Sequence, residues 1–147
     1  MNKREKAIRL MEDIRKSAPR PLIDSISNED KGINFILGYL KCHKDRENNI
    51  VDLAKELGVS TARISVLIRK MENKELVRKT RSKTDARKVM VKISARGERI
   101  ADANFEMMVK AHEKLIECVS EDDLKNFVRV SGIIKDVMED TKAGYER

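Results

Sequence analysis

The sequence predicts a mainly helical fold that contains one small β-hairpin. Apolar residues recur at i, i+3, i+4 and i+7 over most of the 147 residues, which is the spacing of one helix face. Residues 76–93 are the exception, because two short runs of β-favouring residues flank a polar loop there. The composition agrees with this fold class, since 39% of the residues are charged and only 3% are aromatic.

Three helices are predicted ahead of the hairpin. The first ends before Pro19 and Pro21. The second begins at a weak capping box, Ser27 with Asp30, and ends at the polar run 44–49. The third is short. The apolar stripes of the three helices are Ala7, Leu10, Met11 and Ile14; Ile33, Ile36, Leu37 and Leu40; and Ile50, Leu53, Ala54 and Leu57.

A fourth helix is expected to follow the third after a tight turn. Gly58 is suited to be the left-handed residue that ends the third helix, and Ser60 or Thr61 to cap the fourth. Two helices joined in this way form a helix-turn-helix. The runs 76–80 and 88–93 then form a hairpin wing beside it. The stripe that the fourth helix is expected to bury consists of Ile64, Leu67, Ile68 and Met71.

Two long helices are predicted after the hairpin. One begins at Ser94, and the last begins at a cap formed by Ser120 and Asp123. We divide the chain, as one structural domain overall, into an N-terminal helix with its connector (1–26), a winged helix-turn-helix region (27–93) and C-terminal helices (94–147). The seam expected on the first long helix is Ala101, Phe105, Met108, His112, Leu115 and Val119. The last helix carries one stripe of Leu124, Phe127, Val128, Ile134 and Met138 and a second of Val130, Ile133 and Val137.

The positive charge of the chain is concentrated in and behind the helix-turn-helix. Residues 60–92 hold eleven Lys or Arg and three Asp or Glu, a surplus of +8, whereas the whole chain carries only +7. A basic block of this size on a helix-turn-helix with a wing indicates a protein that binds nucleic acid.

The central residues resemble the MarR-type winged-helix regulators. The resemblance rests on residues 53–60 (LAKELGVS), on residues 71–77 (MENKELV), and above all on the wing, Arg81 and Asp85-Ala86-Arg87, followed by Ile-Ser-Ala-Arg-Gly at 93–97. In the family the last portion reads Asp-x-Arg and then Leu-Thr-x-x-Gly. The resemblance implies a homodimer with interlocked terminal helices and a small, often aromatic effector that enters between these helices and the wing domain.

One position departs from the family pattern. Glu75 stands where the family usually has Gly before Leu-Val, so we expect Asn73 or Lys74 to supply the turn geometry.

The fourth helix and the hairpin loop carry the candidate contacts to double-stranded DNA. The major groove is about 12 Å wide and admits one helix, whose first N–H groups suit a phosphate oxygen, and an Arg on a wing can read the minor groove. Asp85 is expected to order the wing by pairing with the guanidinium of Arg87 or of another Arg. The candidate DNA contacts are Ser60, Thr61, Ala62, Arg63, Ser65, Val66, Arg69 and Lys70 on the helix, and Arg81, Lys83, Arg87 and Lys88 on the hairpin.

The terminal helices are expected to join two subunits. A helix that is apolar on two sides needs two partners, and a two-fold axis matches a palindromic site with half-sites roughly 10 bp apart. The alternative is an intramolecular bundle. The candidate interface residues are Leu10, Met11, Ile14, Phe127, Ile134 and Met138.

The sequence gives little support to catalysis. His43 and His112 are far apart, and the chain has no metal-ligand spacing, P-loop or nucleophile elbow, so we predict no enzyme, no metal and no cofactor. Cys42, beside His43 and Lys44, is a candidate oxidation sensor, although the simplest interpretation of Cys42 and Cys118 is that both are buried thiols. His112 is expected to be a hydrogen-bonded core residue. The sequence contains neither a membrane-spanning run nor a secretion signal, so the cytoplasm is the default location, with no membrane partner.

Two functions remain open at this stage. The first is a sequence-specific transcriptional regulator, a repressor in our interpretation, that binds a pseudo-palindromic operator as a homodimer and is released by a small-molecule or oxidative signal. The alternative is a winged-helix interaction module that docks RNA or an acidic protein and has no specific operator. A specificity ratio over random duplex of roughly a thousandfold would favour the first.

Overall fold

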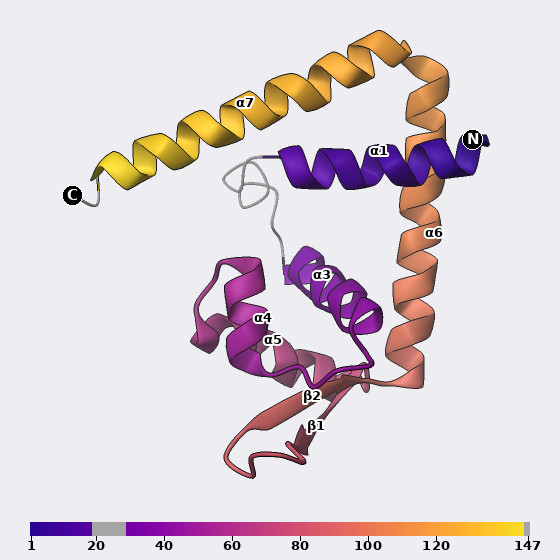
Figure 1. Cartoon of the computed structure of the whole chain (residues 1–147). Coiled ribbons are helices and arrows are strands. Elements are labelled where there is room, and N and C mark those ends of the chain that lie inside the picture. The colour runs from indigo at the N-terminus through magenta and orange to yellow at the C-terminus, as the bar shows by residue number, and fades with distance from the viewer. Residues whose placement is uncertain (19–28, 146–147) are drawn as a thin grey trace. The chain divides into compact units, whose positions relative to one another are not determined.

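The computed structural model describes residues 1–18 and 29–145, with the backbone alone for residues 29–31. Within these ranges it confirms the predicted mainly helical fold with one hairpin (Figure 1). The capping box predicted at Ser27 lies outside the described residues. No helix in the described ranges is both long enough and apolar enough to cross a membrane. The elements are α1 (Lys3–Ser17), α3 (Glu29–Cys42), α4 (Ile50–Leu57), α5 (Thr61–Asn73), β1 (Val77–Arg81), β2 (Val89–Ile93), α6 (Ala95–Cys118) and α7 (Glu121–Tyr145).

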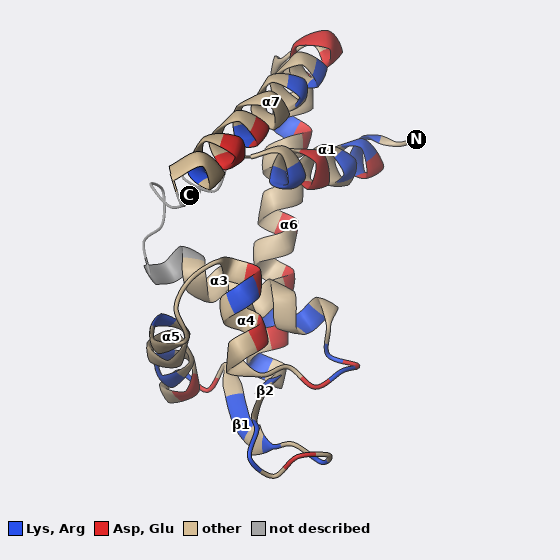
Figure 2. Cartoon of the chain, turned by 60° about the vertical axis from the view of Figure 1, so that its left-hand side comes forward, with Lys and Arg blue, Asp and Glu red and all other residues tan. Residues whose placement is uncertain are grey.

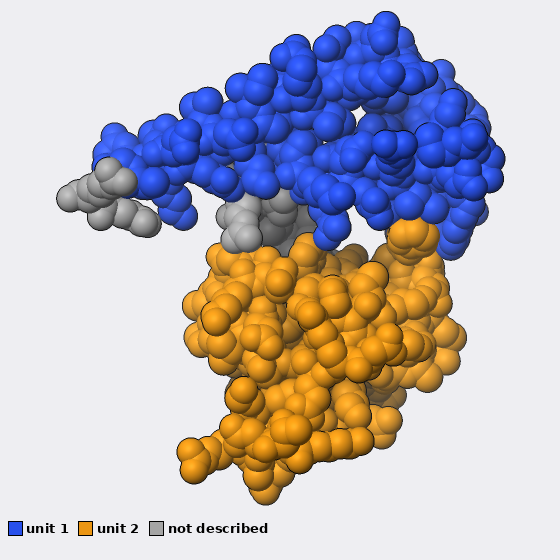
Figure 3. Space-filling model, viewed as in Figure 1, with its two compact units in different colours: residues 1–27, 106–147 blue, residues 28–105 orange. Residues whose placement is uncertain are grey.

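The chain forms two compact units (Figure 3). Residues 28–105, here the winged-helix unit, contain α3, α4, α5, the hairpin and the first part of α6. Residues 1–27 and 106–147, the terminal-helix unit, contain α1, the rest of α6 and α7. This differs from the single domain with a boundary at residue 94 that we predicted. The difference arises because α6 is one unbroken helix whose first turns belong to the core of the winged-helix unit.

The core of the winged-helix unit consists of the apolar stripes that the sequence predicts. The stripes of α3 and α5 are buried, and α4 buries Leu53 and Ala54 while Ile50 and Leu57 are partly buried. Ala101 brings α6 into the same cluster. Since burial of one such side chain contributes roughly 1.5–3 kcal/mol, this cluster holds the three helices and the hairpin together.

The turn between α4 and α5 has the predicted geometry. Gly58 ends α4 in the left-handed conformation, with φ of 66°. Ser60, rather than Thr61, caps α5, because its hydroxyl oxygen accepts a hydrogen bond from the Arg63 amide at 3.2 Å. Asn49 caps α4 in the same way through the Asp52 amide at 2.8 Å. These caps fix where α5 begins and so which of its residues face solvent.

The expectation for the turn after α5 was wrong. Lys74 has φ of −87° and ψ of 4°, whereas Glu75 itself has φ of 59° in the left-handed region. The Leu76 amide donates to the Met71 carbonyl at 2.9 Å, which closes the turn around Glu75. The chain therefore keeps the backbone shape that suits Gly although it carries a Glu there.

We expect Glu75→Gly to stabilise the protein by about 0.5–1 kcal/mol, because a residue with a Cβ is strained at this φ. The substitution also removes an exposed ion pair to Arg96 at 3.7 Å, which is worth little. Chemical denaturation measures the change. Lys74→Gly is the matched control and should destabilise, since Lys74 does not have positive φ. Equal effects of the two substitutions would contradict the assignment of the turn to Glu75.

The hairpin is antiparallel and pairs Val77 with Ile93 through Arg81 with Val89. The Ser94 amide donates to the Leu76 carbonyl and the Ser82 amide to the Lys88 carbonyl, both at 3.0 Å. The hydrogen-bonded pairs are therefore the even-numbered residues, and the N–H groups of odd-numbered residues point away from the partner strand.

The outer edge of β2 is partly covered by the loop before α4. The Val91 amide donates to the Asn48 carbonyl at 2.7 Å, and Asn49 forms an isolated bridge with Met90. The Asn48 side chain is buried and donates to the carbonyls of His43 and Arg46. This loop therefore fixes the root of the hairpin against the helices.

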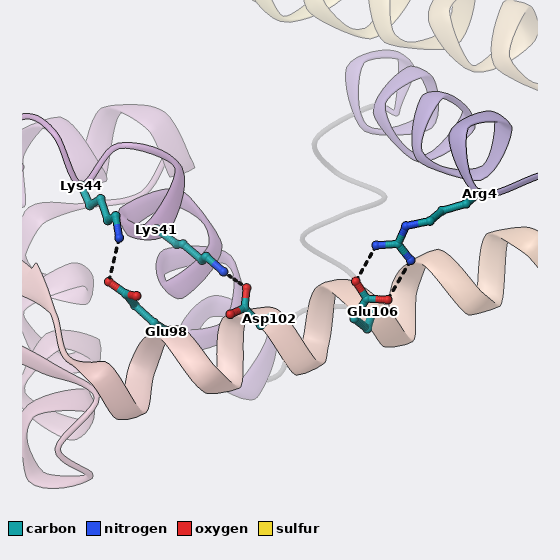
Figure 4. A network of polar contacts seen from close by, with 6 residues as sticks. All are labelled: Arg4, Lys41, Lys44, Glu98, Asp102 and Glu106. Atoms are coloured by element: carbon teal, nitrogen blue, oxygen red, sulfur yellow. Dashed lines mark hydrogen bonds and ion pairs between the residues drawn. The ribbon is translucent and has the colours of Figure 1, made fainter. Parts of the chain in front are cut away.

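The terminal-helix unit is built from α1, the second part of α6 and α7. Ala7 of α1 is buried, and Val109 is the fully buried residue of this part of α6. Arg4 holds Glu106 with two hydrogen bonds of 2.6 and 2.8 Å (Figure 4), and this pairing lowers the pKa of Glu106. Lys3 and Glu117 form a further ion pair between α1 and α6.

The apolar stripes of α7 are divided differently from the prediction. Leu124 is buried and Val128 partly so, whereas Phe127 has 55% of its surface exposed. The predicted cap is confirmed, since the Ser120 hydroxyl accepts from the Asp123 amide at 3.1 Å. The exposed large apolar residues in the middle of α7 form one face, here the α7 apolar face, which consists of Phe127, Val130, Ile133, Ile134, Val137 and Met138.

Candidate nucleic-acid interface

The solvent-facing side of α5 carries the residues that the sequence singled out. Its apolar stripe is buried in the core, so the remaining side chains are turned outward. Val66, an apolar residue, is 50% exposed in the middle of this face. Figure 2 shows Lys and Arg on α5 and along the hairpin. The exposed residues of this face are Thr61, Ala62, Arg63, Val66, Arg69 and Lys70, with Ser65 half-buried.

The N-terminal turn of α5 is ordered by its own hydroxyl groups. The Ser60 hydroxyl oxygen accepts a hydrogen bond from the Arg63 amide, and the Ser65 hydroxyl donates to the Thr61 carbonyl at 2.9 Å. Ser65 therefore makes a local contact in addition to any contact with a ligand. The guanidinium groups of Arg63 and Arg69 have no hydrogen-bond or ion-pair partner in the part of the chain that the structure describes.

The hairpin loop presents four exposed basic residues of the predicted set, Arg81, Lys83, Arg87 and Lys88. The guanidinium groups of Arg81 and Arg87 and the ammonium group of Lys88 have no ion-pair partner within the described ranges, whereas the charge of Lys83 acts on the Glu47 carboxylate. An unpaired cation on a surface costs the fold nothing and keeps its full attraction for a phosphate. The structure brings these residues and the α5 face into one unit, as the sequence predicted.

Asp85 orders the hairpin loop through the backbone rather than through a guanidinium. Its Oδ1 accepts from the Arg87 amide at 3.0 Å, and its carbonyl accepts from the Lys88 amide at 3.0 Å. The predicted ion pair with the Arg87 side chain is not formed among the described residues, because the carboxylate folds back onto the nearer amide two residues along the chain. The Arg87 guanidinium is therefore left for other contacts.

Glu47 is a residue that the sequence did not reveal, and it holds the base of the hairpin loop. Its carboxylate accepts from the Lys83 amide at 2.9 Å and from the Ser82 hydroxyl at 2.8 Å. Ser82 is only 7% exposed, and its oxygen also accepts from the amides of Thr84 and Asp85 at 3.2 Å. The hydrogen bond from the Lys83 amide, followed by that from Ser82, lowers the pKa of Glu47.

This connection is invisible in the sequence because Glu47 and Ser82 are 35 residues apart. Glu47 lies in the polar run that only marked the end of a helix. No spacing rule relates a carboxylate in one loop to a serine in another, so only the folded chain shows the pair.

We expect Glu47→Ala to loosen the hairpin loop at neutral pH, which the hydrogen-exchange protection factor of the Lys83 amide measures. Because the folded-state pKa of Glu47 lies below its ordinary value of 4.5, its contribution is present above that pH and is lost as the pH falls through the lowered pKa. Wild-type protection should therefore fall on acidification, and the variant should lack this step. Glu56→Ala, an exposed carboxylate on α4, is the control. Unchanged protection in Glu47→Ala would contradict the role of Glu47.

The expectation that both cysteines are buried was wrong. Cys42 and Cys118 are the last residues of α3 and α6, off the buried stripes, and both are exposed. Lys41 is engaged by Asp102, and Lys44 by Glu98 at 3.4 Å (Figure 4), so each cation beside Cys42 already has a carboxylate partner.

The two histidines lie outside the core. His112, which we predicted as a core residue, is partly exposed and its Nδ1 lies 2.8 Å from the Met108 carbonyl. His43 lies 2.9 Å from the Tyr39 carbonyl through Nδ1, with its ring centroid 4.3 Å from that of Tyr39. Each histidine therefore contacts the backbone carbonyl four residues before it in the chain.

The family comparison matches the winged-helix unit. The model of the family described as "Transcriptional regulator SarA/Rot" matches residues 32–103. This range contains α3, α4, α5, the hairpin and the first turns of α6. It therefore includes every candidate DNA contact. None of the curated proteins matches the chain.

Several solved structures share the fold at low sequence identity. FabT of Streptococcus pneumoniae in complex with DNA has a TM-score of 0.63 and 21% identity, over 77% of this chain and 75% of its own. MepR, a transcription regulator of the Staphylococcus aureus multidrug efflux pump MepA, has a TM-score of 0.60 and 20% identity, over 86% and 91%. The heme sensor PefR in complex with heme and carbon monoxide has a TM-score of 0.57 and 19% identity, over 86% and 82%.

Proposed function

We propose that the chain is a regulator of the MarR type that represses transcription by binding a pseudo-palindromic operator as a homodimer. The match of residues 32–103 to the SarA/Rot regulators and the fold shared with FabT and MepR support this proposal. One observation carries the proposal. The face of α5 opposite the core is exposed and combines two arginines and a lysine with the short side chains Ala62 and Val66, and the same unit presents the cations of the hairpin loop. A helix for the major groove and a basic loop for the neighbouring minor groove are thus supplied together.

In this proposal each group of residues has a distinct task. Short side chains such as Ala62 and Val66 let α5 approach the base edges, and Arg63 and Arg69 reach bases or the flanking phosphates. Arg87, Lys83 and the other cations of the hairpin loop contact the minor groove and the adjacent backbone. The FabT structure in complex with DNA supports the use of this fold on a duplex.

The homodimer part of the proposal is supported by the α7 apolar face. Six large apolar side chains lie exposed on this face of one helix. Single exposed apolar residues are common on protein surfaces, but a contiguous group of this kind is typical of an interface. Phe127, Ile134 and Met138 of the predicted interface belong to this face. Leu10, Met11 and Ile14 are half-buried on α1 of the same unit. A second copy of the chain that covers this face would hold the two winged-helix units of the dimer at a fixed separation.

We expect sedimentation to show a dimer at micromolar concentration. Ile133→Glu, at a position with 51% of its surface exposed, should shift the protein toward monomer because it places a charge in the apolar face. Glu139→Gln, an exposed position on the same helix, is the control. A wild-type protein that sediments only as monomer would overturn the homodimer.

Release by a signal completes the proposal. The relatives in structure include a regulator of a multidrug efflux pump and a heme sensor, which supports a small-molecule signal. Exposure of Cys42 is compatible with an oxidative one, and oxidation by peroxide followed by a DNA-binding measurement would distinguish the two.

Selection of bound sites from random duplex DNA tests the function directly. We expect a palindromic consensus and a preference over random duplex of roughly a thousandfold or more at physiological salt. An interaction module that docks RNA or an acidic protein would give no consensus and would lose nearly all of its duplex affinity in salt. That outcome would contradict the proposal of a specific operator and would favour an RNA or acidic-protein partner.

A further inference from the structure

A hollow beside the outer edge of β2 combines positive side chains with a backbone donor. It measures about 130 Å³, several times the space that one water molecule needs. Its walls come from the end of α3, the loop that follows, β2 and the first turn of α6. Four charged residues line it, namely Lys44, Arg46, Lys92 and Glu98. All of them belong to the winged-helix unit.

The backbone donor belongs to Ile93. Odd-numbered N–H groups of β2 point to its outer edge, as the ladder register requires. The Val91 amide is taken by the Asn48 carbonyl, but the Ile93 amide has no partner among the described residues. Ile93 lines the hollow, so its free N–H lies at a sheet edge of the kind that binds anions.

Of the three cations around this donor, Lys92 has no partner in the part of the chain that the structure describes. Lys92 stands directly opposite Arg78 in the ladder, and like charges at such positions repel. Within the described ranges neither side chain has a counter-charge. Arg46 uses one nitrogen on the Tyr39 hydroxyl at 2.5 Å, which leaves other donors of its guanidinium available.

One carboxylate opposes this positive charge. Glu98 lies 3.4 Å from Lys44 across the hollow, and both side chains are at least a third exposed, so the pair is weak and open to exchange. The three cations outnumber the single anion. An incoming oxyanion would gain charge-assisted hydrogen bonds from Lys44, Arg46 and Lys92 and would relieve the repulsion between Lys92 and Arg78.

We propose that this hollow is a binding site for a small oxyanion of the phosphate class, held by the Ile93 amide and the side chains of Lys44, Arg46 and Lys92. None of the candidate DNA contacts lines the hollow. The hollow is therefore not among the DNA contacts assigned above, and its binding of phosphate can be measured without any operator.

The test is a titration of inorganic phosphate into the full-length protein at constant ionic strength, followed at the Ile93 amide by NMR. The Ile93 signal should shift and saturate. Lys92→Gln should weaken phosphate binding about three- to tenfold, because the phosphate then has one charge-assisted hydrogen bond fewer at a partly exposed site. Glu98→Gln should strengthen it, because Lys44 is released. Lys55→Gln, an exposed lysine on α4 outside the hollow, should bind phosphate as the wild type does.

Two results would overturn the site. One is an Ile93 amide that does not respond to phosphate, and the other is equal phosphate binding by Lys92→Gln and Lys55→Gln. If Lys92→Gln fails to fold, the Glu98→Gln variant still tests the site. Phosphate binding by Glu98→Gln that is weaker than or equal to that of the wild type would also contradict the proposal.

A second measurement identifies the source of the phosphate group. If Lys92→Gln lowers the affinity for the selected duplex and Lys55→Gln does not, the group belongs to the DNA backbone. If both variants bind the duplex equally while only Lys92→Gln loses inorganic phosphate, the ligand is a free oxyanion. Either result upholds the site.

Discussion

Gly97→Ala is expected to destabilise the protein by about 2–4 kcal/mol, the upper range for overpacking a rigid contact. A Cβ at Gly97 would lie 2.2 Å from the Leu76 carbonyl oxygen and 2.8 Å from Cγ1 of Ile93. The carbonyl cannot move aside freely, because it accepts the Ser94 amide at 3.0 Å at the junction of the hairpin and α6. The melting temperature should fall by about 10 °C.

Gly38→Ala provides the matched control for this prediction. Gly38 lies inside α3, and a Cβ there would meet nothing within 4 Å. Ala is the better helix former by about 0.5–1 kcal/mol, so this substitution should leave the protein equally or more stable. If Gly97→Ala melted within about a degree of Gly38→Ala, the close approach of α6 to the hairpin root would be absent in solution.

The same junction shows why Gly97 matters to the rest of α6. The Ser94 hydroxyl accepts from the Gly97 amide at 3.0 Å and donates to the Glu75 carbonyl at 2.6 Å. The start of α6 is thus tied to the turn after α5 and to the first strand. Disruption of this junction would loosen the hairpin relative to α5 and should therefore lower DNA affinity as well as stability.

Features that depend on local spacing could be predicted from the sequence. The buried stripes of α3 and α5 follow a helical period, and the Ser60 cap and the left-handed Gly58 follow from residue type and position. The two strands were placed to within one residue for the same reason. Exposure of the α5 face then follows, because a helix that buries one side must present the other.

Features that depend on distant contacts could not be predicted. Glu47 accepts a hydrogen bond from Ser82 of the hairpin loop, and the Asn48 carbonyl accepts one from Val91 of β2. Both contacts join segments that are dozens of residues apart in the sequence. The prediction for the turn at Glu75 was wrong for another reason. Residue type argues against positive φ for Glu, but the hydrogen bond from Leu76 to Met71 and the packing of Leu76 outweigh a strain of roughly 1 kcal/mol.

Arg87→Ala is expected to weaken binding to the selected operator by about tenfold or more at fixed salt, which corresponds to about 1–3 kcal/mol for one groove contact. The side chain is exposed, and the only part of the residue that the loop uses is its amide, which Ala retains. The fold should therefore be unchanged in circular dichroism and melting. The salt dependence of binding should also become shallower, by about one counter-ion for each phosphate that Arg87 neutralises.

Two further variants separate groove contact from general charge. Arg99→Ala removes an exposed arginine of α6 in the same unit and should change operator affinity little. Arg87→Lys keeps the charge but loses the planar fork, so it should restore only part of the affinity if the guanidinium reads the groove. Full restoration by Lys would make Arg87 a simple phosphate contact. An unchanged dissociation constant for Arg87→Ala would remove the wing from the mechanism and leave α5 as the sole reading element.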